Sequence, residues 1–291
     1  EALRCLSCGC QDVNECKLRE YATEYGVRQD AFKGFYKEHP IDESHPYIER
    51  DPNKCIMCGR CVRICEQIQG LGILGFVGRG YGVTVQPELS QPFGCVENCV
   101  KCGQCVSACP VGALTEKTSL SKPGPFVEKV TDTVCTFCGA GCSLQLRTVG
   151  DLIVRVTTQA RAGLNEGNLC EKGRFNTAIL NRRDRLKTPL VRKNGELVPC
   201  TMDEAIEAVK AGITGDLAVY ISGRATNEEA KALASIAANR GGKTSSFGIN
   251  PAAESFCLAC PDKAVTSYED IKNADLFAAI NCDVYGNPYV Q

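Results

Sequence analysis

Residues 99–110 read CVKCGQCVSACP and residues 55–65 read CIMCGRCVRIC, so the chain carries nearly the same cysteine phrase twice. Each phrase has the spacing C-x2-C-x2-C-x3-C. The cysteines are Cys55, Cys58, Cys61 and Cys65 in the first phrase and Cys99, Cys102, Cys105 and Cys109 in the second. A cubane cluster of four irons and four sulfides needs four thiolates around it, and this spacing is typical of such ligands. The doubled phrase therefore predicts two [4Fe–4S] sites.

The fourth cysteine of each phrase is predicted to ligate the cluster of the other phrase, as in bacterial two-cluster ferredoxins. One cubane would then be held by Cys55, Cys58, Cys61 and Cys109, and the other by Cys99, Cys102, Cys105 and Cys65. Gly59 and Gly103 allow the backbone to approach the clusters. A zinc ribbon is the competing interpretation, but it would need two C-x2-C pairs rather than triplets that end in x3-C.

Composition excludes several classes of protein. Among 291 residues, 44% are hydrophobic and 23% charged, which indicates a globular chain rather than a disordered one. A net charge of −1 gives no reason to expect nucleic acid as a partner, and no apolar run is long enough to span a membrane. The 21 cysteines are an odd number and lie mostly two residues apart, which favours metal ligation over a disulfide scaffold. We therefore expect a reducing, cytoplasmic location.

A third cysteine group stands at 135–142, CTFCGAGC, and its fourth member follows in LCEKGRF. Between them, residues 143–158 alternate apolar and polar side chains on both sides of Gly150-Asp151, which predicts a hairpin. That hairpin would return the chain so that the four cysteines form another cubane site. These ligands are Cys135, Cys138, Cys142 and Cys170. Zinc would fit the ligand count as well, but the neighbouring clusters favour iron.

A fourth group opens the chain in CLSCGCQDVNEC. Its cysteines are Cys5, Cys8, Cys10 and Cys16, and we predict a fourth [4Fe–4S] cluster there, followed by a short helix within 14–27. The other five cysteines receive no ligand role. We expect small buried side chains at Cys95, Cys200 and Cys282, and Cys257 and Cys260 stay unassigned. His39 and His45 each precede a proline, and we interpret them as solvated loop residues rather than ligands.

Regular secondary structure is predicted around these groups. Residues 71–94 are glycine-rich with alternating apolar positions, which indicates a hairpin inserted between the two phrases. After about residue 190, helices are predicted at 201–213 and 227–241, a buried strand at 216–222, and a short helix and strand within 268–281. This order predicts a parallel α/β unit. The sequence contains no GxGxxG, Walker or Ser/His/Asp pattern, so no flavin or nicotinamide site is assigned.

The predicted fold class is α+β followed by α/β, in four domains. Residues 1–50 form a small N-terminal cluster segment and residues 51–130 a two-cluster ferredoxin-like domain. Residues 131–188 form a β-rich [4Fe–4S] domain, and residues 189–291 a partial parallel α/β domain.

These motifs resemble two known families. Residues 51–115 resemble the two-cluster domain of the large iron–sulfur subunit of complex I, of NAD-linked formate dehydrogenases and of iron-only hydrogenases. Residues 131–291 resemble the start of the molybdopterin oxidoreductase family, through CTFCGAGC, LCEKGRF and the segments 185–206 and 266–280. The opening EALRCLSCGC looks like the tail of a flavoprotein of the glutamate-synthase small-subunit type. By this likeness Lys172 would lie between cubane and pterin and assist electron transfer.

Two departures from these families matter. Complex I subunits ligate their first cubane with one His and three Cys, whereas here four cysteines must do so alone. The pterin domain is short, and residues 250–265 make Cys257 a doubtful counterpart of the family's metal ligand. We therefore expect no molybdopterin in this chain.

The resemblance implies an electron relay in a multi-subunit oxidoreductase linked to NAD(P)H and ferredoxin, which would be flavin-based and electron-bifurcating in some relatives. Its expected partners are a flavoprotein that handles NAD(P)H, ferredoxin and further iron–sulfur subunits. Two rival functions are the N-terminal part of a molybdenum or tungsten formate dehydrogenase and a zinc-holding structural protein.

Overall fold

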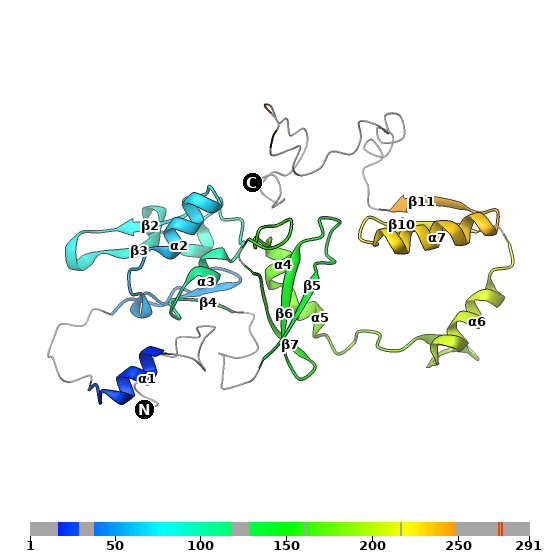
Figure 1. Cartoon of the computed structure of the whole chain (residues 1–291), viewed down its shortest axis with the longest axis horizontal. Coiled ribbons are helices and arrows are strands. Elements are labelled where there is room, and N and C mark those ends of the chain that lie inside the picture. Colours follow the sequence, from blue (N-terminus) through cyan, green and yellow to red (C-terminus); the bar gives the residue numbers. More distant parts are fainter. Residues whose placement is uncertain are drawn as a thin grey trace. The chain divides into compact units, whose positions relative to one another are not determined.

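The computed structural model describes residues 17–28, 38–117, 128–159, 161–215, 217–247, 273 and 275. These residues divide into two compact units. The first contains the described residues up to 134 together with 142–181, and the second contains 135–141 and the described residues from 182 onward. The doubled cysteine phrase lies entirely in the first unit, coloured blue to green in Figure 1.

The helices and strands are short. The α-helices are α1 (Lys17–Glu24), α2 (Arg60–Arg63), α3 (Gln104–Ala108), α4 (Glu171–Phe175), α5 (Thr177–Leu180), α6 (Met202–Gly212) and α7 (Asn227–Asn239). A π-helical turn, η3 (Ile64–Ile68), continues α2, and 3-10 turns are η2 (Pro52–Lys54), η4 (Gly80–Gly82), η5 (Glu88–Ser90) and η6 (Phe93–Cys95). The helix α1 agrees with the short helix predicted within 14–27.

Strand pairing joins the two ends of the ferredoxin-like region. Strand β1 (Ile48–Arg50) precedes the first cysteine phrase, and β4 (Leu114–Glu116) follows the second. The two pair antiparallel, and the backbone N–H of Asp51 extends the ladder by donating to the carbonyl of Ala113 at 2.9 Å. Because Cys55 follows β1 and Cys109 precedes β4, this pairing brings the start of one phrase beside the end of the other.

A hairpin separates the two phrases, as the sequence predicted. Strands β2 (Leu74–Val77) and β3 (Thr84–Pro87) pair antiparallel with Leu74 opposite Pro87. Gly78 makes the turn possible: its φ is +95°, and a Cβ there would lie 2.6 Å from the carbonyl oxygen of Gly82. The hairpin projects from the helices of the cysteine region (Figure 1).

The core of the first unit lies between the cysteine phrases and the segment after Cys170. Ile48, Leu74 and Phe93 are almost fully buried, and several of the cysteines pack against the same cluster. Phe175 from α4 is 2% exposed and belongs to this core too. The segment that carries Cys170 is thus packed directly on the ferredoxin-like region rather than joined to it by a linker.

A three-stranded antiparallel sheet carries the third cysteine group. Strands β6 (Ser143–Val149) and β7 (Leu152–Thr157) form the predicted hairpin, with Gly150 at φ +58° in its turn. Strand β5 (Lys129–Val134), which the sequence analysis did not single out, pairs with β6 and places Val134 opposite Ser143. All its side chains are exposed, so it lacks the apolar alternation that marks a half-buried strand.

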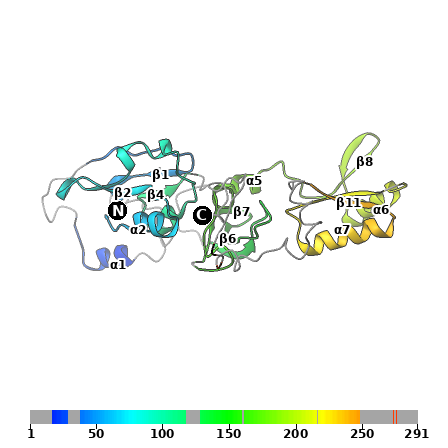
Figure 2. The same ribbon diagram turned by 90° about the horizontal axis from the view of Figure 1, so that it is seen from above.

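The second unit contains the predicted parallel α/β element. Strands β10 (Ala218–Ser222) and β11 (Lys243–Phe247) pair in parallel and are joined by α7, which Figure 2 shows running beside them. Helix α6 begins with a capping box between Thr201 and Glu204, and α7 begins with one between Thr226 and Glu229. The helix and strand predicted within 268–281 lie outside the described residues.

One further hairpin was not predicted: β8 (Leu190–Lys193) and β9 (Glu196–Pro199) turn through Asn194 and Gly195, both at positive φ. Asn-Gly between apolar residues is a strong hairpin signal that could have revealed it. Across the ranges that the structure describes, no helix is both long and apolar enough to cross a membrane.

Candidate metal centres

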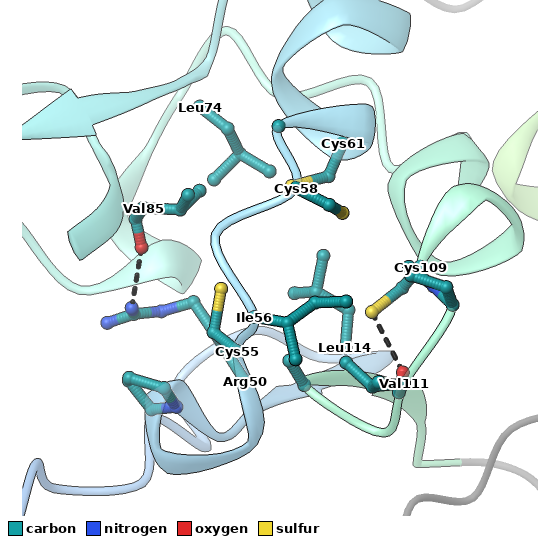
Figure 3. A pocket seen from close by; sticks show the side chains of 14 residues that line it. Arg50, Cys55, Ile56, Cys58, Cys61, Leu74, Val85, Cys109, Val111 and Leu114 are labelled. Carbon is teal, nitrogen blue, oxygen red and sulfur yellow. Dashed lines mark hydrogen bonds between the residues drawn. The ribbon is translucent and has the colours of Figure 1, made fainter. Parts of the chain in front are cut away.

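The first pocket gathers cysteines from both phrases. It is lined by Cys55, Cys58, Cys61 and Cys109, and it encloses about 480 Å³, open solvent at its mouth included. Figure 3 shows Cys109 on the α3 side, while Cys55 and Cys58 come from the loop before α2 and Cys61 from α2 itself. The remaining lining is mainly apolar, and Arg50 enters it with its guanidinium bonded to the carbonyl of Val85.

The second pocket contains the complementary set. It is lined by Cys65, Cys99, Cys102 and Cys105 and encloses about 370 Å³ measured in the same way. Cys65 comes from η3, whereas the other three come from the second phrase. The structure therefore brings together the two predicted sets of four, each with one cysteine from the other phrase.

The two ligand loops adopt the same backbone geometry. Met57 and Lys101 occupy matching positions one residue before the second cysteine of each phrase, and both have positive φ, at 57° and 54°. This conformation is costly for residues other than glycine. In the first loop it turns the backbone N–H of Met57 toward Cys55 Sγ at 3.4 Å. The strained backbone thus aims amide donors at the sulfurs.

Glycine is required directly after the second cysteine of each loop. Gly59 and Gly103 both have φ near +70° and begin the helices α2 and α3. A Cβ on Gly59 would come within 3.0 Å of side-chain ends of Arg63 and Phe76, whereas one on Gly103 would lie 2.8 Å from Phe175. Gly103 therefore serves the contact with α4 as well as the ligand loop.

Burial shapes the acidity of the pocket thiols. It raises the pKa of Cys61 and of Cys99 to about 11, and it raises that of Cys105 well above the ordinary thiol value. Neighbouring thiols add to the effect. Buried thiolates gathered in this way are unfavourable without a positive charge between them, and iron supplies that charge.

The donor set fits iron–sulfur clusters. The eight cysteines of the doubled phrase carry free thiols. Over the ranges described, no three Cys, His, Asp or Glu side chains lie close enough to hold a single metal ion, and the cysteines of each pocket instead surround a space. Four thiols around a mainly apolar space are what a cubane needs for ligation and shielding from water.

His45 is a site residue that the sequence analysis missed, and its prediction as a solvated loop residue is wrong. Its side chain is 1% exposed and packs on Phe93 with ring centroids 4.8 Å apart. The ring Nδ1 accepts the backbone N–H groups of Tyr47 and Ile48, so the neutral ring carries its proton on Nε2. That nitrogen lies 4.0 Å from Cys99 Sγ.

Burial, together with the charges of Lys101 and Lys117, lowers the pKa of His45 to about 4. The ring is therefore neutral near pH 7. The proline after His45 suggested an exposed loop. The segment 42–45 is instead bound to a distant part of the chain, since Phe93 N–H donates to Asp42 and Gly94 N–H to Ser44. His39, by contrast, is half-buried.

The third cysteine group flanks paired strands. Cys135 directly follows β5 and Cys142 directly precedes β6, and both side chains are buried, whereas Cys138 is exposed. Asn165 ties the returning chain to this point: its side chain accepts from Ser143 N–H at 2.8 Å and donates to the carbonyls of Ser143 and Asn168. The segment that ends at Cys170 is thus held beside Ser143, the residue directly after Cys142.

Helix α4, which starts at the residue after Cys170, contacts the second cysteine loop. Arg174 is 1% exposed, and its guanidinium donates to the carbonyl of Cys102 at 3.1 Å, to Ser107 Oγ at 2.9 Å and to Gln104 Oε1 at 3.4 Å. Glu171 accepts a hydrogen bond from Tyr47 at 2.5 Å and lies 3.9 Å from the Lys101 ammonium. Sequence reasoning missed this contact, since its partners lie about seventy residues away.

The remaining candidates have mixed outcomes. Cys5, Cys8, Cys10 and Cys16 lie outside the described residues, as do Cys257, Cys260 and Cys282, so their predicted roles stay predictions. Cys95 is exposed, so the expectation of a buried side chain there is wrong; it follows Gly94 at the end of η6. Cys200 is half-buried. Lys172 is exposed, and its role in electron transfer likewise stays a prediction.

Comparison with known families matches the same regions. Residues 45–115 match the NADH-quinone oxidoreductase subunit 3 ferredoxin-like domain, residues 98–144 the 4Fe-4S dicluster domain, and residues 128–182 the molybdopterin oxidoreductase Fe4S4 domain.

Three similar proteins span most of the chain. A subunit of the NADH-quinone oxidoreductase of Rhizobium meliloti is 36% identical over 67% of this chain and 23% of its own length. The alpha subunit of an NADPH-Fe(3+) oxidoreductase of Geobacter sulfurreducens is 31% identical over 76% and 26%. A formate dehydrogenase-like protein of Staphylococcus aureus is 29% identical over 77% and 27%. The chain thus spans about a quarter of the length of these relatives.

One solved structure, of an NAD+-reducing [NiFe]-hydrogenase in the H2-reduced state, is 34% identical over 38% of this chain and 46% of that chain. Its TM-score of 0.31 is too low to show a shared fold. The family matches confirm the resemblance inferred from the sequence. Residues 45–115 are thus similar to the ferredoxin-like domain of NADH-quinone oxidoreductase subunit 3, and residues 128–182 to the molybdopterin oxidoreductase Fe4S4 domain.

Proposed function

We propose that this chain is an iron–sulfur relay that carries electrons through a multi-subunit, NAD(P)H-linked oxidoreductase. The observation that carries the proposal is the direct contact between the ligand loop of the second pocket and the segment of Cys170. Arg174 donates a hydrogen bond to the carbonyl of Cys102. Lys101, directly before Cys102, forms an ion pair with Glu171, directly after Cys170. The segment that carries Cys170 is thereby held against the second cysteine loop.

Side chains of this protein would keep the path for electron transfer short and would exclude water from it. Tyr47 and Phe175 stack with ring centroids 4.9 Å apart and an interplanar angle of 2°, which fills the space between the two ligand segments. Gln104 donates to the carbonyl of Gly167 at 3.1 Å and also to Asn168, and Gln69 donates to Asn168 at 2.9 Å. Packing of this kind fixes the separation between the second cysteine loop and the segment that carries Cys170. When bound, the clusters supply one-electron redox chemistry.

The proposed cofactors are four [4Fe–4S] clusters on the sixteen predicted cysteines. The partners we propose are a flavoprotein that reacts with NAD(P)H, ferredoxin and further iron–sulfur subunits, in a cytoplasmic complex. Support comes from the relatives, whose names give them as subunits of NADH- and NADPH-linked oxidoreductases, and from the lack of a nucleotide-binding motif in this sequence.

The test is the iron content and magnetic behaviour of anaerobically purified protein. We expect on the order of sixteen irons per chain, from four per cubane. After dithionite reduction, electron paramagnetic resonance (EPR) should show signals broadened by coupling between neighbouring clusters. An iron content near eight with uncoupled ferredoxin-type signals would contradict the relay, because the N-terminal and the 135–170 sites would then be empty.

A second candidate function is the N-terminal part of a molybdenum or tungsten formate dehydrogenase. The match of residues 128–182 to the molybdopterin oxidoreductase Fe4S4 domain favours it. We propose nevertheless that this 291-residue chain binds neither metal, because the described part of residues 189–291 supplies one α/β unit while a pterin cofactor needs an enclosed cavity. Elemental analysis separates the two: stoichiometric molybdenum or tungsten would favour the enzyme.

A further inference from the structure

Arg174 is a buried cation, and its hydrogen bonds to the residues that the structure describes involve no carboxylate. It is among the largest fully buried side chains, and its three hydrogen bonds go to neutral oxygens, on Cys102, Ser107 and Gln104. A buried charge without a contacting counter-ion is strongly unfavourable. A structural cross-link between two segments could be made by a neutral side chain at lower cost. The positive charge of Arg174 therefore needs an explanation beyond a structural cross-link.

The negative partners around Arg174 are one carboxyl group and two of the predicted cluster ligands. The thiols of Cys102 and Cys105 and the carboxyl group of Glu116 are the groups whose charges favour the protonated guanidinium. Burial raises the pKa of Glu116, and the charges of Arg174 and Arg155 act in the opposite direction. Arg174 in turn favours the thiolate of Cys102. The cation thus faces the second pocket, where four thiolates and a cluster would place negative charge.

We propose that Arg174 is a positioning residue that raises the reduction potential of the cluster in the second pocket. The inference rests on the proposed function, since it requires that cluster to be present. Reduction adds one electron from an external donor and makes the cluster more negative, while no covalent bond forms or breaks. A fixed positive charge favours that reduced state, and burial alone would disfavour it. Arg174 offsets the effect of burial.

Arg174 belongs to the segment of the third cysteine group, although the cluster that it would affect is in the second pocket. Arg174 lies in α4, four residues after Cys170, so the residue that sets the potential of one site belongs to the segment that ligates the next. The first loop has an exposed counterpart, because Arg63 donates to the carbonyl of Cys58 at 3.2 Å at a position where solvent screens its charge. Arg50 in the lining of the first pocket is bonded to Val85 and lies 3.5 Å from Asp42, which compensates its charge. The effect should therefore be confined to the second cluster.

The test is a redox titration followed by EPR on the full chain, with Cys58→Ser and Cys102→Ser used to assign signals to the first and second pockets. Arg174→Met removes the charge and keeps a long side chain. Arg174→Lys keeps the charge but loses the forked hydrogen bonds. Arg182→Met, which removes an exposed arginine paired with Asp184, is the matched control.

We expect Arg174→Met to lower the reduced-to-oxidised ratio of the second cluster about tenfold at a fixed potential, or about 59 mV for one electron. Arg174→Lys and Arg182→Met should stay within about twofold, and the first cluster should not respond. Equal shifts in the Met and Lys variants, or no shift in either, would overturn the proposal, because a purely structural role predicts no difference between them. If the unmodified chain lacks both ferredoxin-type signals, the proposed function itself fails.

Discussion

The two cysteine pockets arise from nearly the same sequence phrase, yet their surroundings differ. Ile56, on the rim of the first pocket, is 61% exposed, and its cation Arg50 is held by Asp42 and Val85. Two side chains that are each 1% exposed, His45 and Arg174, lie against cysteines that line the second pocket. One directs a ring N–H toward Cys99 and the other a guanidinium toward the carbonyl of Cys102.

This difference shows which properties the repeat determines and which it does not. The spacing of the cysteines, the strained residues Met57 and Lys101 and the glycines that follow them are common to both loops, so the ligand geometry is duplicated. Electrostatics comes from elsewhere in the chain, from a loop before the first phrase and a helix long after the second. Two clusters with equal ligands can therefore have different potentials.

The two loops should differ most in the stability that each loses when its glycine, Gly59 or Gly103, is replaced by alanine. Alanine at positive φ costs about 1–2 kcal/mol at either site. Gly59→Ala meets the ends of flexible side chains, whereas Gly103→Ala meets Phe175 at 2.8 Å and must displace α4. We expect Gly103→Ala to lower the temperature at which cluster absorbance is lost well below that of Gly59→Ala. Equal losses would show that α4 is not held at this point.

Much of the fold could be predicted from the sequence, because the decisive signals are local. Cysteine spacing indicated both pockets, and alternation around Gly150-Asp151 indicated the β6–β7 hairpin. The environment of His45 and Arg174 could not be predicted, because burial there depends on contacts with residues about fifty to seventy positions away. Strand β5 was missed since its side chains are all exposed, and it is recognised only by pairing with β6.

A smaller difference is expected from His45. In His45→Asn the side-chain oxygen can take the place of Nδ1 and accept the N–H groups of Tyr47 and Ile48, while the donor toward Cys99 is lost. Hydrogen bonds to the sulfurs raise cluster potentials. We expect the second cluster to be reduced about threefold less at a fixed potential, roughly half the logarithmic effect of Arg174→Met. A shift of the first cluster instead would contradict the assignment of His45 to the second pocket.

The smallest effect concerns pH. Because the pKa of His45 is lowered to about 4 in the folded protein, the ring stays neutral above pH 6. Its proton should not change when the neighbouring cluster is titrated, so the potential of the second cluster should be flat with pH between about 6 and 8. A slope that begins near pH 6.5 and disappears in His45→Asn would show that the ring gains a proton on reduction.

The central claim is that each pocket takes its fourth ligand from the other phrase, and one set of EPR spectra tests it most directly. The spectra compare dithionite-reduced protein carrying Cys109→Ala or Cys65→Ala with the assigned variants Cys58→Ser and Cys102→Ser. We predict that Cys109→Ala alters the same signal as Cys58→Ser, and that Cys65→Ala alters the same signal as Cys102→Ser. Loss of the Cys102→Ser signal in Cys109→Ala would show that each phrase ligates its own cluster and would contradict the account.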